Sequence, residues 1–208
     1  MTFGAEAVNA LRRALVALII VAIPAGGLGA EAVSDRPAGG GIDGLMLGLA
    51  QVKSARGRFV ERKYLRILSE PIESSGTLLY RAPDRIEKEV VRPRTERMVV
   101  DGDKLTIDRG TDGGARTLSL AEYPHIQAIV EGIRATLAGD LLTIRRFYEV
   151  DYRGDAAAWL LILQPREQKL RNLVASIRIA GTGNAIRTVE TIEGDGDRSM
   201  MSVEEDTR

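Results

Sequence analysis

Apolar residues recur along this chain with two different spacings. Two sets fall three or four residues apart, the spacing of one face of a helix. The first set predicts an amphipathic helix that ends near Ser54: Ile42, Leu45, Met46, Leu49 and Val52. Pro124 and Gly139 suit the start and the end of a second helix, expected over residues 121–138. Its apolar stripe is Ile126, Ile129, Val130, Ile133 and Leu137. A shorter helical piece is expected over 140–145.

Most other apolar residues alternate with polar ones in short segments bounded by Gly, Pro or Asp, which is the pattern of strands. The turns that join most of these segments are only a few residues long, so consecutive strands must run antiparallel. The predicted fold class is α+β: one large curved antiparallel sheet, an incomplete barrel, covered on its concave face by helices. The expected strands are 57–68, 75–81, 85–91, 95–100, 104–109, 115–120, 147–152, 157–163, 174–179, 186–192 and 199–203.

The beginning of the chain has the pattern of a secretory signal. Arg12 and Arg13 precede the apolar run 14–23, and residues 30–32, Ala-Glu-Ala, form an A-x-A cleavage site. The run is shorter than the about 20 residues that a membrane-spanning helix needs. We therefore expect a signal peptide over 1–32, a flexible Pro/Gly-rich leader over 33–41 and a single domain over 42–208 in the periplasm.

Composition and charge exclude several classes of function. The 208 residues include 29 basic and 29 acidic side chains, so no net charge draws the molecule to nucleic acid. The absence of cysteine excludes disulfides, thiol nucleophiles and zinc–thiolate sites. His125 is the single histidine and no G-x-S-x-G motif occurs, so a catalytic triad is not expected. We predict no catalytic residues, no metal and no cofactor.

Two groups of carboxylates invite a chemical interpretation. The acidic turns 101–103 and 193–197 could bind calcium, but neither has the alternating ligands and terminal Glu of an EF-hand loop. Hairpin turns are the preferred interpretation. Glu87 and Glu89 share one strand face, as a glycosidase pair might, but Arg85 and Lys88 accompany them. A solvated strand face is preferred there.

Four short motifs, in order along residues 42–204, resemble those of the LolA-like outer-membrane lipoprotein carriers. Residues 75–83, SGTLLYRAP, are similar to the family's strand-turn G-x-L-x-x-x-x-P, and residues 98–105, MVVDGDKL, to its D-G hairpin. Phe59 matches the phenylalanine of an F-x-Q motif, with Glu61 in place of Gln. Residues 197–199 are similar to a D-x-R-S strand entry. The resemblance implies an incomplete β-barrel closed by a helical lid, which carries acylated lipoproteins between membranes.

The chain also departs from the family's pattern. The lipoprotein carriers place an Arg directly before the strand-ending proline, where this chain has Ala82, and Arg81 lies one residue earlier. A shift of one residue turns a strand side chain to the opposite face. The tryptophan expected further along is Lys88. The chain therefore resembles a divergent branch of the family, with a cargo that need not be a triacylated lipoprotein.

Pattern and resemblance together predict a periplasmic carrier that binds acylated cargo, a lipid or a lipoprotein, in a hydrophobic cavity and moves it between the inner and outer membranes. Its expected partners are an inner-membrane transporter, ABC or RND-like, and an outer-membrane acceptor. We expect a monomer that does not bind nucleic acid. The alternative is a non-carrier scaffold or sensor protein of the cell envelope on the same fold, with an interior filled by its own side chains.

The residues predicted to line the cavity and its lid come from both the strands and the two helices. They would contact acyl chains because each buried methylene contributes about 0.8 kcal/mol. The set is Leu49, Phe59, Leu78, Tyr80, Ile86, Val90, Met98, Val100, Ile126, Ile129, Val130 and Ile133.

Overall fold

A computed structural model describes residues 41–110 and 114–206. The expected signal peptide (1–32) and the leader as far as residue 40 lie outside the described residues. Across the two described ranges, no helix is both long enough and apolar enough to cross a membrane.

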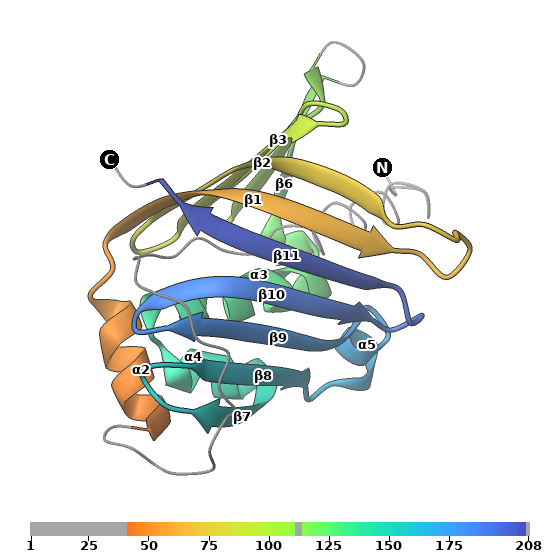
Figure 1. The fold of residues 1–208 in the computed structure, drawn as a ribbon. Coiled ribbons are helices and arrows are strands. Elements are labelled where there is room, and N and C mark those ends of the chain that lie inside the picture. The colour runs from red at the N-terminus through yellow and green to blue at the C-terminus, as the bar shows by residue number, and fades with distance from the viewer. Residues whose placement is uncertain (1–40, 111–113, 207–208) are drawn as a thin grey trace.

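Eleven strands form a single antiparallel sheet in the order β6-β5-β4-β3-β2-β1-β11-β10-β9-β8-β7 (Figure 1). Two meanders make up this sheet, and the first and last strands of the described chain join them at its centre. The strands are β1 (Ser54–Tyr64), β2 (Ile72–Arg81), β3 (Arg85–Arg92), β4 (Glu96–Asp101), β5 (Lys104–Asp108), β6 (Ala115–Ser119), β7 (Tyr148–Gly154), β8 (Trp159–Pro165), β9 (Val174–Thr182), β10 (Ala185–Glu193) and β11 (Arg198–Glu205).

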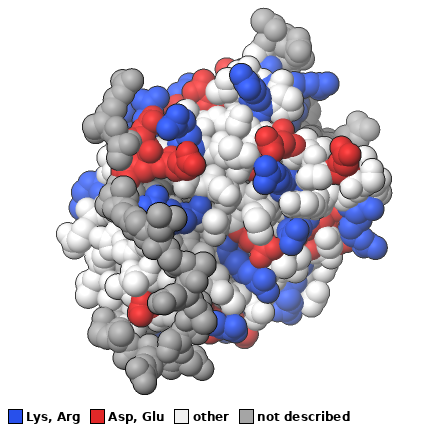
Figure 2. Space-filling view, viewed as in Figure 1, with Lys and Arg blue, Asp and Glu red and all other residues white. Residues whose placement is uncertain are grey.

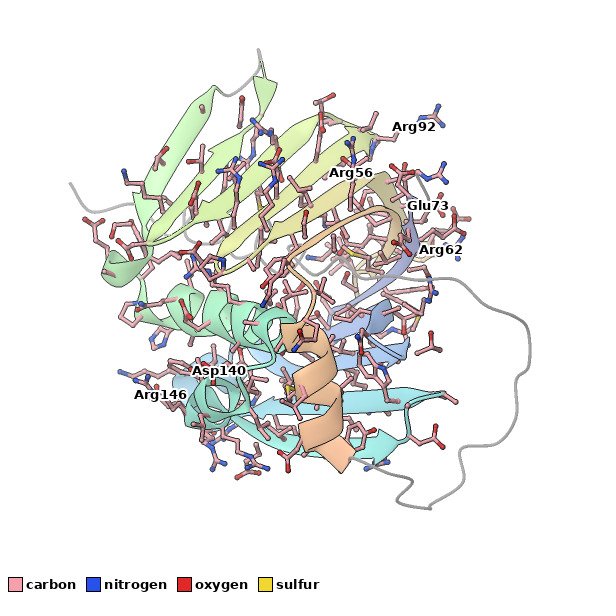
Figure 3. All side chains as sticks on the ribbon, turned by 90° about the vertical axis from the view of Figure 1, so that its left-hand side faces the viewer. Arg56, Arg62, Glu73, Arg92, Asp140 and Arg146 are labelled. Carbon is pink, nitrogen blue, oxygen red and sulfur yellow. The ribbon has the colours of Figure 1, made fainter. Side chains whose placement is uncertain are left out.

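The helices lie on one side of this sheet, between its two bent arms (Figures 1 and 3). They are α2 (Gly41–Ala50), the 3-10 turn η2 (Leu120–Glu122), α3 (Pro124–Ala138), α4 (Leu141–Phe147) and α5 (Gln168–Arg171). The predicted α+β class, with an open curved antiparallel sheet and helices on its concave face, is confirmed.

The predicted elements are all present, with shifted ends. The first strand was expected over 57–68 but covers Ser54–Tyr64, because the chain turns away after Tyr64. Asp197 accepts a hydrogen bond from the Arg66 backbone N–H (3.0 Å), which holds this turn beside the β10–β11 hairpin. The second helix begins only at Pro124, after η2, since proline has no N–H to donate and suits the first helical turn.

The concave face of the sheet carries the hydrophobic core. In β1 buried and exposed residues alternate from Ser54 to Arg62, as expected for a strand that is covered on one face. Helix α3 is more enclosed than its single predicted stripe suggests. Its buried residues include Ala128, Gly132 and Thr136 on the side away from the sheet-facing stripe. Helices α2 and α4 pack against α3, so α3 lies inside the molecule.

Two glycines allow helices to approach their neighbours closely. A Cβ at Gly48 of α2 would lie 2.1 Å from Oδ1 of Asn184 in the β9–β10 turn. A Cβ at Gly132 of α3 would lie 2.5 Å from the ring of Tyr148, whose hydroxyl donates to the Ala128 carbonyl (3.2 Å). A larger residue at Gly132 would meet the buried Tyr148 ring, whereas one at Gly48 would meet the exposed side chain of Asn184, which can turn aside.

The junction of α3 and α4 depends on one carboxylate, Asp140, labelled in Figure 3. Its side chain accepts hydrogen bonds from the backbone N–H (3.0 Å) and the hydroxyl (2.6 Å) of Thr143, which makes it the N-cap of α4. The hydroxyl hydrogen bond, aided by the backbone one, lowers the pKa of Asp140 below its ordinary value. A lowered folded-state pKa means that the ionised carboxylate favours the folded protein.

We predict that Asp140→Ala lowers the free energy of unfolding by about 1 kcal/mol at neutral pH, the usual cost of losing an N-cap. The contribution is fully present above the unfolded-state pKa of about 3.9 and is lost as pH falls through the lower folded-state pKa. Urea titrations at pH 7 and pH 2.5 measure it. The control Asp151→Ala removes an exposed carboxylate that pairs with exposed Arg153, and it should cost less than about 0.5 kcal/mol at either pH.

Candidate functional site

The apolar side chains predicted to line the cavity and lid meet in one hydrophobic cluster on the concave face. All except Val90 are buried, and Val90 is partly buried against the same cluster. The register explains how the strands assemble it, because Tyr80, Ile86 and Val100 are cross-strand partners on three neighbouring strands. Leu49 joins them from α2, and the stripe of Ile126, Ile129, Val130 and Ile133 joins them from α3.

A charged group lies within this apolar surface. Lys88 of β3 is fully buried, and its Nζ donates to Oε2 of Glu61 on β1 at 2.7 Å. The other carboxylate oxygen of Glu61 accepts a hydrogen bond from the hydroxyl of Ser199 on β11. The ammonium also lies 4.7 Å from the centroid of the Phe59 ring, within range of a cation–π interaction. We call Glu61, Lys88 and Ser199 the buried polar triad.

The strand positions place this triad on the inner face. Glu61 follows Phe59 by two residues in β1, and Lys88 follows Ile86 by two in β3, so each points the same way as a core residue. Lys88 must reach across β2 to meet Glu61. Gly76 of β2, the register partner of Phe59, places no side chain on the face that Lys88 crosses. A Cβ at Gly76 would lie 1.8 Å from the carbonyl oxygen of Glu89.

Burial and the ion pair shift the pKa of Lys88 in opposite directions. Removal from water lowers its pKa, because the charged ammonium loses hydration, and the charge and hydrogen bond of Glu61 oppose this decrease. Glu96 and Lys63 are the other charges that act on the ammonium. A pair as deeply buried as this one costs more desolvation than a surface pair and contributes little net stability.

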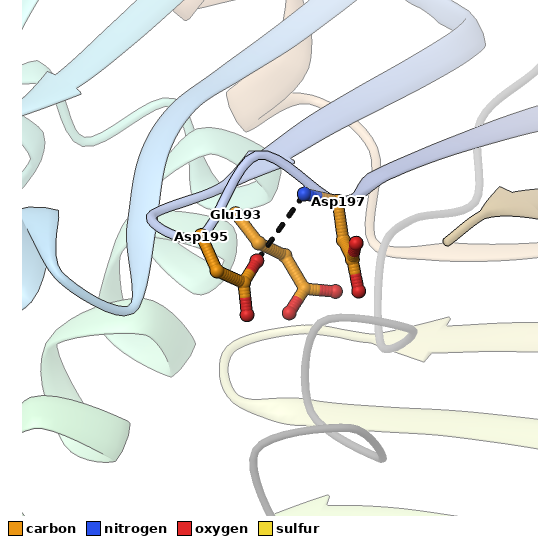
Figure 4. A group of neighbouring side chains, drawn as sticks. All are labelled: Glu193, Asp195 and Asp197. Atoms are coloured by element: carbon orange, nitrogen blue, oxygen red, sulfur yellow. Dashed lines mark hydrogen bonds between the residues drawn. The ribbon is translucent and has the colours of Figure 1, made fainter. Parts of the chain in front are cut away.

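A second ion pair, between Lys63 and Glu193, lies between the buried polar triad and the β10–β11 hairpin. Lys63 Nζ lies 2.8 Å from Oε1 of Glu193, which is buried. Glu193, Asp195 and Asp197 bring carboxylate oxygens within 4.8 Å of one another (Figure 4). The Asp197 backbone N–H donates to Asp195 (3.2 Å), as in an ordinary tight turn. Arg66 donates from its guanidinium to the Asp195 carbonyl (2.8 Å), so cationic side chains already hold this hairpin.

The outer face of the sheet is polar and electrically mixed. Figure 2 shows blue and red side chains interspersed over the strands on this side. Glu87 accepts from the guanidinium of Arg97 (2.9 Å to Nε) on the neighbouring strand, and Glu89 is exposed. Arg62 and Glu73, labelled in Figure 3, form an exposed pair at 3.0 Å. These contacts are those of a solvated strand face, the preferred interpretation of Glu87 and Glu89.

The sequence pattern identified buried apolar residues of the concave face but missed the buried polar triad. A signal was present, because Lys88 occupies the apolar register of β3 between Ile86 and Val90, and Glu61 continues the inward register of Phe59. A charged residue at an inward strand position needs a partner, and the pattern alone does not say which strand supplies it. Two of the three positions that depart from the family's motifs, Glu61 and Lys88, contact each other.

Known proteins similar to this chain were found among family models and among solved structures. A family model described as outer membrane lipoprotein carrier protein LolA-like matches residues 35–204. No curated protein matches the chain. Among solved structures, the chain is similar to a LolA superfamily protein from Nitrosomonas europaea, at 8% identity and a TM-score of 0.40, covering 79% of this chain and 92% of that one.

The chain is also similar to a chain of the MucA/MucB complex of Pseudomonas aeruginosa, at 15% identity and a TM-score of 0.40. That match covers 76% of this chain and 54% of the other, so this chain spans about half of the length of that relative.

The geometry of the buried polar triad generates a stability prediction. Lys88→Met leaves the Glu61 carboxylate in the interior without its ammonium partner, and it should lower the free energy of unfolding by about 3–5 kcal/mol. Adding Glu61→Gln removes the charge while keeping an acceptor for Ser199, and it should recover most of that loss. Urea unfolding of the single and double variants measures both steps. Equal losses in the two variants would contradict the pairing.

Proposed function

The chain belongs to the family of LolA-like outer membrane lipoprotein carrier proteins, and we propose that it carries acylated cargo in the hydrophobic interior between its sheet and its helices. The observation that supports this most directly is the single apolar cluster on the concave face, to which β1–β5 contribute from one side and α2 and α3 from the other. Carriage is non-covalent and needs no reactive side chain.

The apolar side chains of the cluster, which we call the apolar wall, supply enough binding energy for an acyl chain. Each methylene removed from water contributes about 0.8 kcal/mol, so a dozen contribute roughly 10 kcal/mol before the cost of ordering the chain is subtracted. The wall is built mainly from Leu, Ile, Val and Met, whose contacts with hydrocarbon do not depend on direction. Such a surface accepts acyl chains of different lengths.

Helix α2 is the part of the lid that we propose to move. It lies beside β7, β8 and the β9–β10 turn around a concavity of about 140 Å³. Gly48 and Asn184 form the close contact at this seam. The residues that line the concavity are Gly41, Gly44, Leu45, Tyr152, Ala156, Trp159, Gly183 and Asn184.

In the proposed cycle, the protein works in the periplasm. It accepts its cargo from an inner-membrane transporter, either of the ABC type or an RND-like exporter, shields the acyl chain beneath α2 and α3, and releases it to an outer-membrane acceptor. The protein acts as a monomer and performs no covalent chemistry.

Native mass spectrometry of protein purified from the periplasm, followed by organic extraction and lipid analysis, tests this function. We expect a stoichiometric acyl-bearing adduct that extraction removes. A protein that arrives without lipid and takes up no fluorescent fatty acid would instead be a scaffold or sensor of the cell envelope, with an interior filled by its own side chains.

A disulfide across the α2 seam tests the proposed motion. The chain has no cysteine, so Gly48→Cys with Asn184→Cys introduces a unique pair. Cγ of Asn184 lies about where the Sγ of a cysteine would, and it is 3.0 Å from an ideal Cβ at position 48. This is close to the about 3 Å between a Cβ and the far sulfur of a disulfide. Oxidation should reduce uptake of a fluorescent fatty acid at least about tenfold, because the open state loses its population, and reduction should restore it.

A matched control bridges two strands without touching α2. Thr106 and Thr117 are cross-strand partners whose hydroxyl oxygens lie 3.0 Å apart, so Thr106→Cys with Thr117→Cys can form an equivalent bridge in β5–β6. Its oxidation should leave uptake unchanged. Equal uptake by the oxidised and reduced forms of the α2 variant would show that cargo enters elsewhere.

A further inference from the structure

The connection between β1 and β2 presents large apolar side chains to solvent. Ile67 is 87% exposed, more than any other large apolar residue of the described ranges, and Leu68 is 47% exposed. Ile72, the first residue of β2, is 45% exposed. Single exposed apolar side chains are common on protein surfaces, but several within a few positions mark a contact surface. We call residues 65–72 the apolar turn.

Polar contacts hold the apolar turn in place and leave its side chains outside the core. The Leu68 backbone N–H donates to the Leu65 carbonyl (2.9 Å), which closes a tight turn around Ile67. The backbone N–H and the guanidinium of Arg66 donate to the 195–197 turn at 3.0 and 2.8 Å. The backbone is therefore fixed by its own polar groups, and burial of Ile67 plays no part in fixing it.

Positive charge lies at the same end of the sheet. The β1–β2 and β3–β4 connections share that end, because neighbouring strands run in opposite directions. Arg92 and Arg94 are both exposed, and neither forms a salt bridge within the described ranges. Arg62 and Glu73 neutralise each other at 3.0 Å, and Figure 3 shows Arg92 on the same side of the molecule as this pair. Glu70, the carboxylate of the apolar turn, offsets one of the two remaining positive charges.

We propose that the apolar turn docks the protein on an anionic lipid bilayer, with Ile67 and Leu68 among the acyl chains and Arg92 and Arg94 at the headgroups. A fluid apolar phase closes around a protruding side chain, whereas a protein partner would have to supply a matching pocket. The internal hydrogen bond of the turn lowers the cost of bringing its backbone to the apolar boundary. This surface lies outside the interior, so docking does not require bound cargo.

The size of the apolar turn predicts reversible docking. Ile67 and Leu68 together have fewer side-chain carbons than a single myristoyl chain, which alone gives only marginal, reversible binding to membranes. The two arginines add attraction to anionic lipid that salt screens. Docking of this strength brings the protein to a membrane surface and lets it leave again.

The test is co-sedimentation of the full-length periplasmic protein with vesicles of phosphatidylcholine, with and without phosphatidylglycerol. We expect the wild-type protein to partition more strongly into the vesicles that contain phosphatidylglycerol. Ile67→Ser with Leu68→Ser should lower the partition coefficient at least about tenfold in both kinds of vesicle. Arg92→Gln with Arg94→Gln should lower it by about fivefold for each arginine, and only where phosphatidylglycerol is present.

The matched control removes two equally exposed leucines from other elements. Leu47 of α2 and Leu142 of α4 are 68% and 80% exposed, and Figure 1 shows α2 far from the β1–β2 connection. Leu47→Ser with Leu142→Ser should partition like the wild-type protein. The same urea midpoint in all variants shows that each is folded, because every substituted side chain is exposed.

Three outcomes would overturn the inference. They are a wild-type protein that sediments with neither kind of vesicle, a variant at Ile67 and Leu68 that partitions like the wild-type protein, and an equal loss in the leucine control. The carrier function is judged separately by uptake of the fluorescent fatty acid, which the variant at Ile67 and Leu68 should retain. A wild-type protein that docks on vesicles but takes up no fatty acid would keep the inference and lose the carrier function.

Discussion

The pairing of β1 with β11 is the contact on which the rest of this structure depends. It runs from Gly57–Glu205 to Tyr64–Arg198 and joins segments that are about 140 residues apart in sequence. Without it, β1–β6 and β7–β11 would be two separate meanders, and neither alone could wrap around α3. With it, the two form one sheet whose bent arms enclose the helices (Figure 3). The same pairing brings Ser199 beside Glu61. The apolar interior and its polar centre therefore both form only when the ends of the domain meet.

The local pattern of apolar and polar residues predicted the helices and strands but not the pairing of β1 with β11. Alternation placed Leu78, Tyr80, Ile86, Met98 and Val100 on one face, and short turns such as Asp101-Gly102 determined which neighbours pair. Both signals lie within a few residues of where they act. No such signal connects Tyr64 with Arg198, because their register depends on the accumulated twist of the strands between them. The expected strand over 57–68 extended too far for a related reason, since contacts of Arg66 with the distant 195–197 turn end it.

Helix α3 shows a second limit of periodicity. Its stripe of Ile126, Ile129, Val130 and Ile133 correctly indicated the face toward the sheet. The opposite face is also buried, because α4 and Tyr148 pack there, and small residues such as Gly132 accommodate them. Small residues contribute little to a hydrophobic stripe. The sequence pattern therefore suggests that this opposite face of α3 is exposed to solvent, whereas in the structure it is tightly packed. Burial raises the pKa of Tyr148, consistent with a phenol held inside the molecule. Helix α3 is therefore packed on two sides, and α2 is the helix that we propose to move.

A carrier must bind its cargo tightly enough to shield it and weakly enough to release it. An apolar wall alone gives affinity that rises with every methylene and treats all chains of one length alike. The buried polar triad interrupts this wall, because Glu61 and Lys88 place a hydrogen-bonded ion pair at inward strand positions that apolar residues would otherwise fill. The Phe59 ring lies beside the Lys88 ammonium, so the apolar and charged parts of the inner face are in direct contact. The departures from the family's motifs at Glu61 and Lys88 are thus coupled, because replacing either residue alone would remove the charge with which the other is paired.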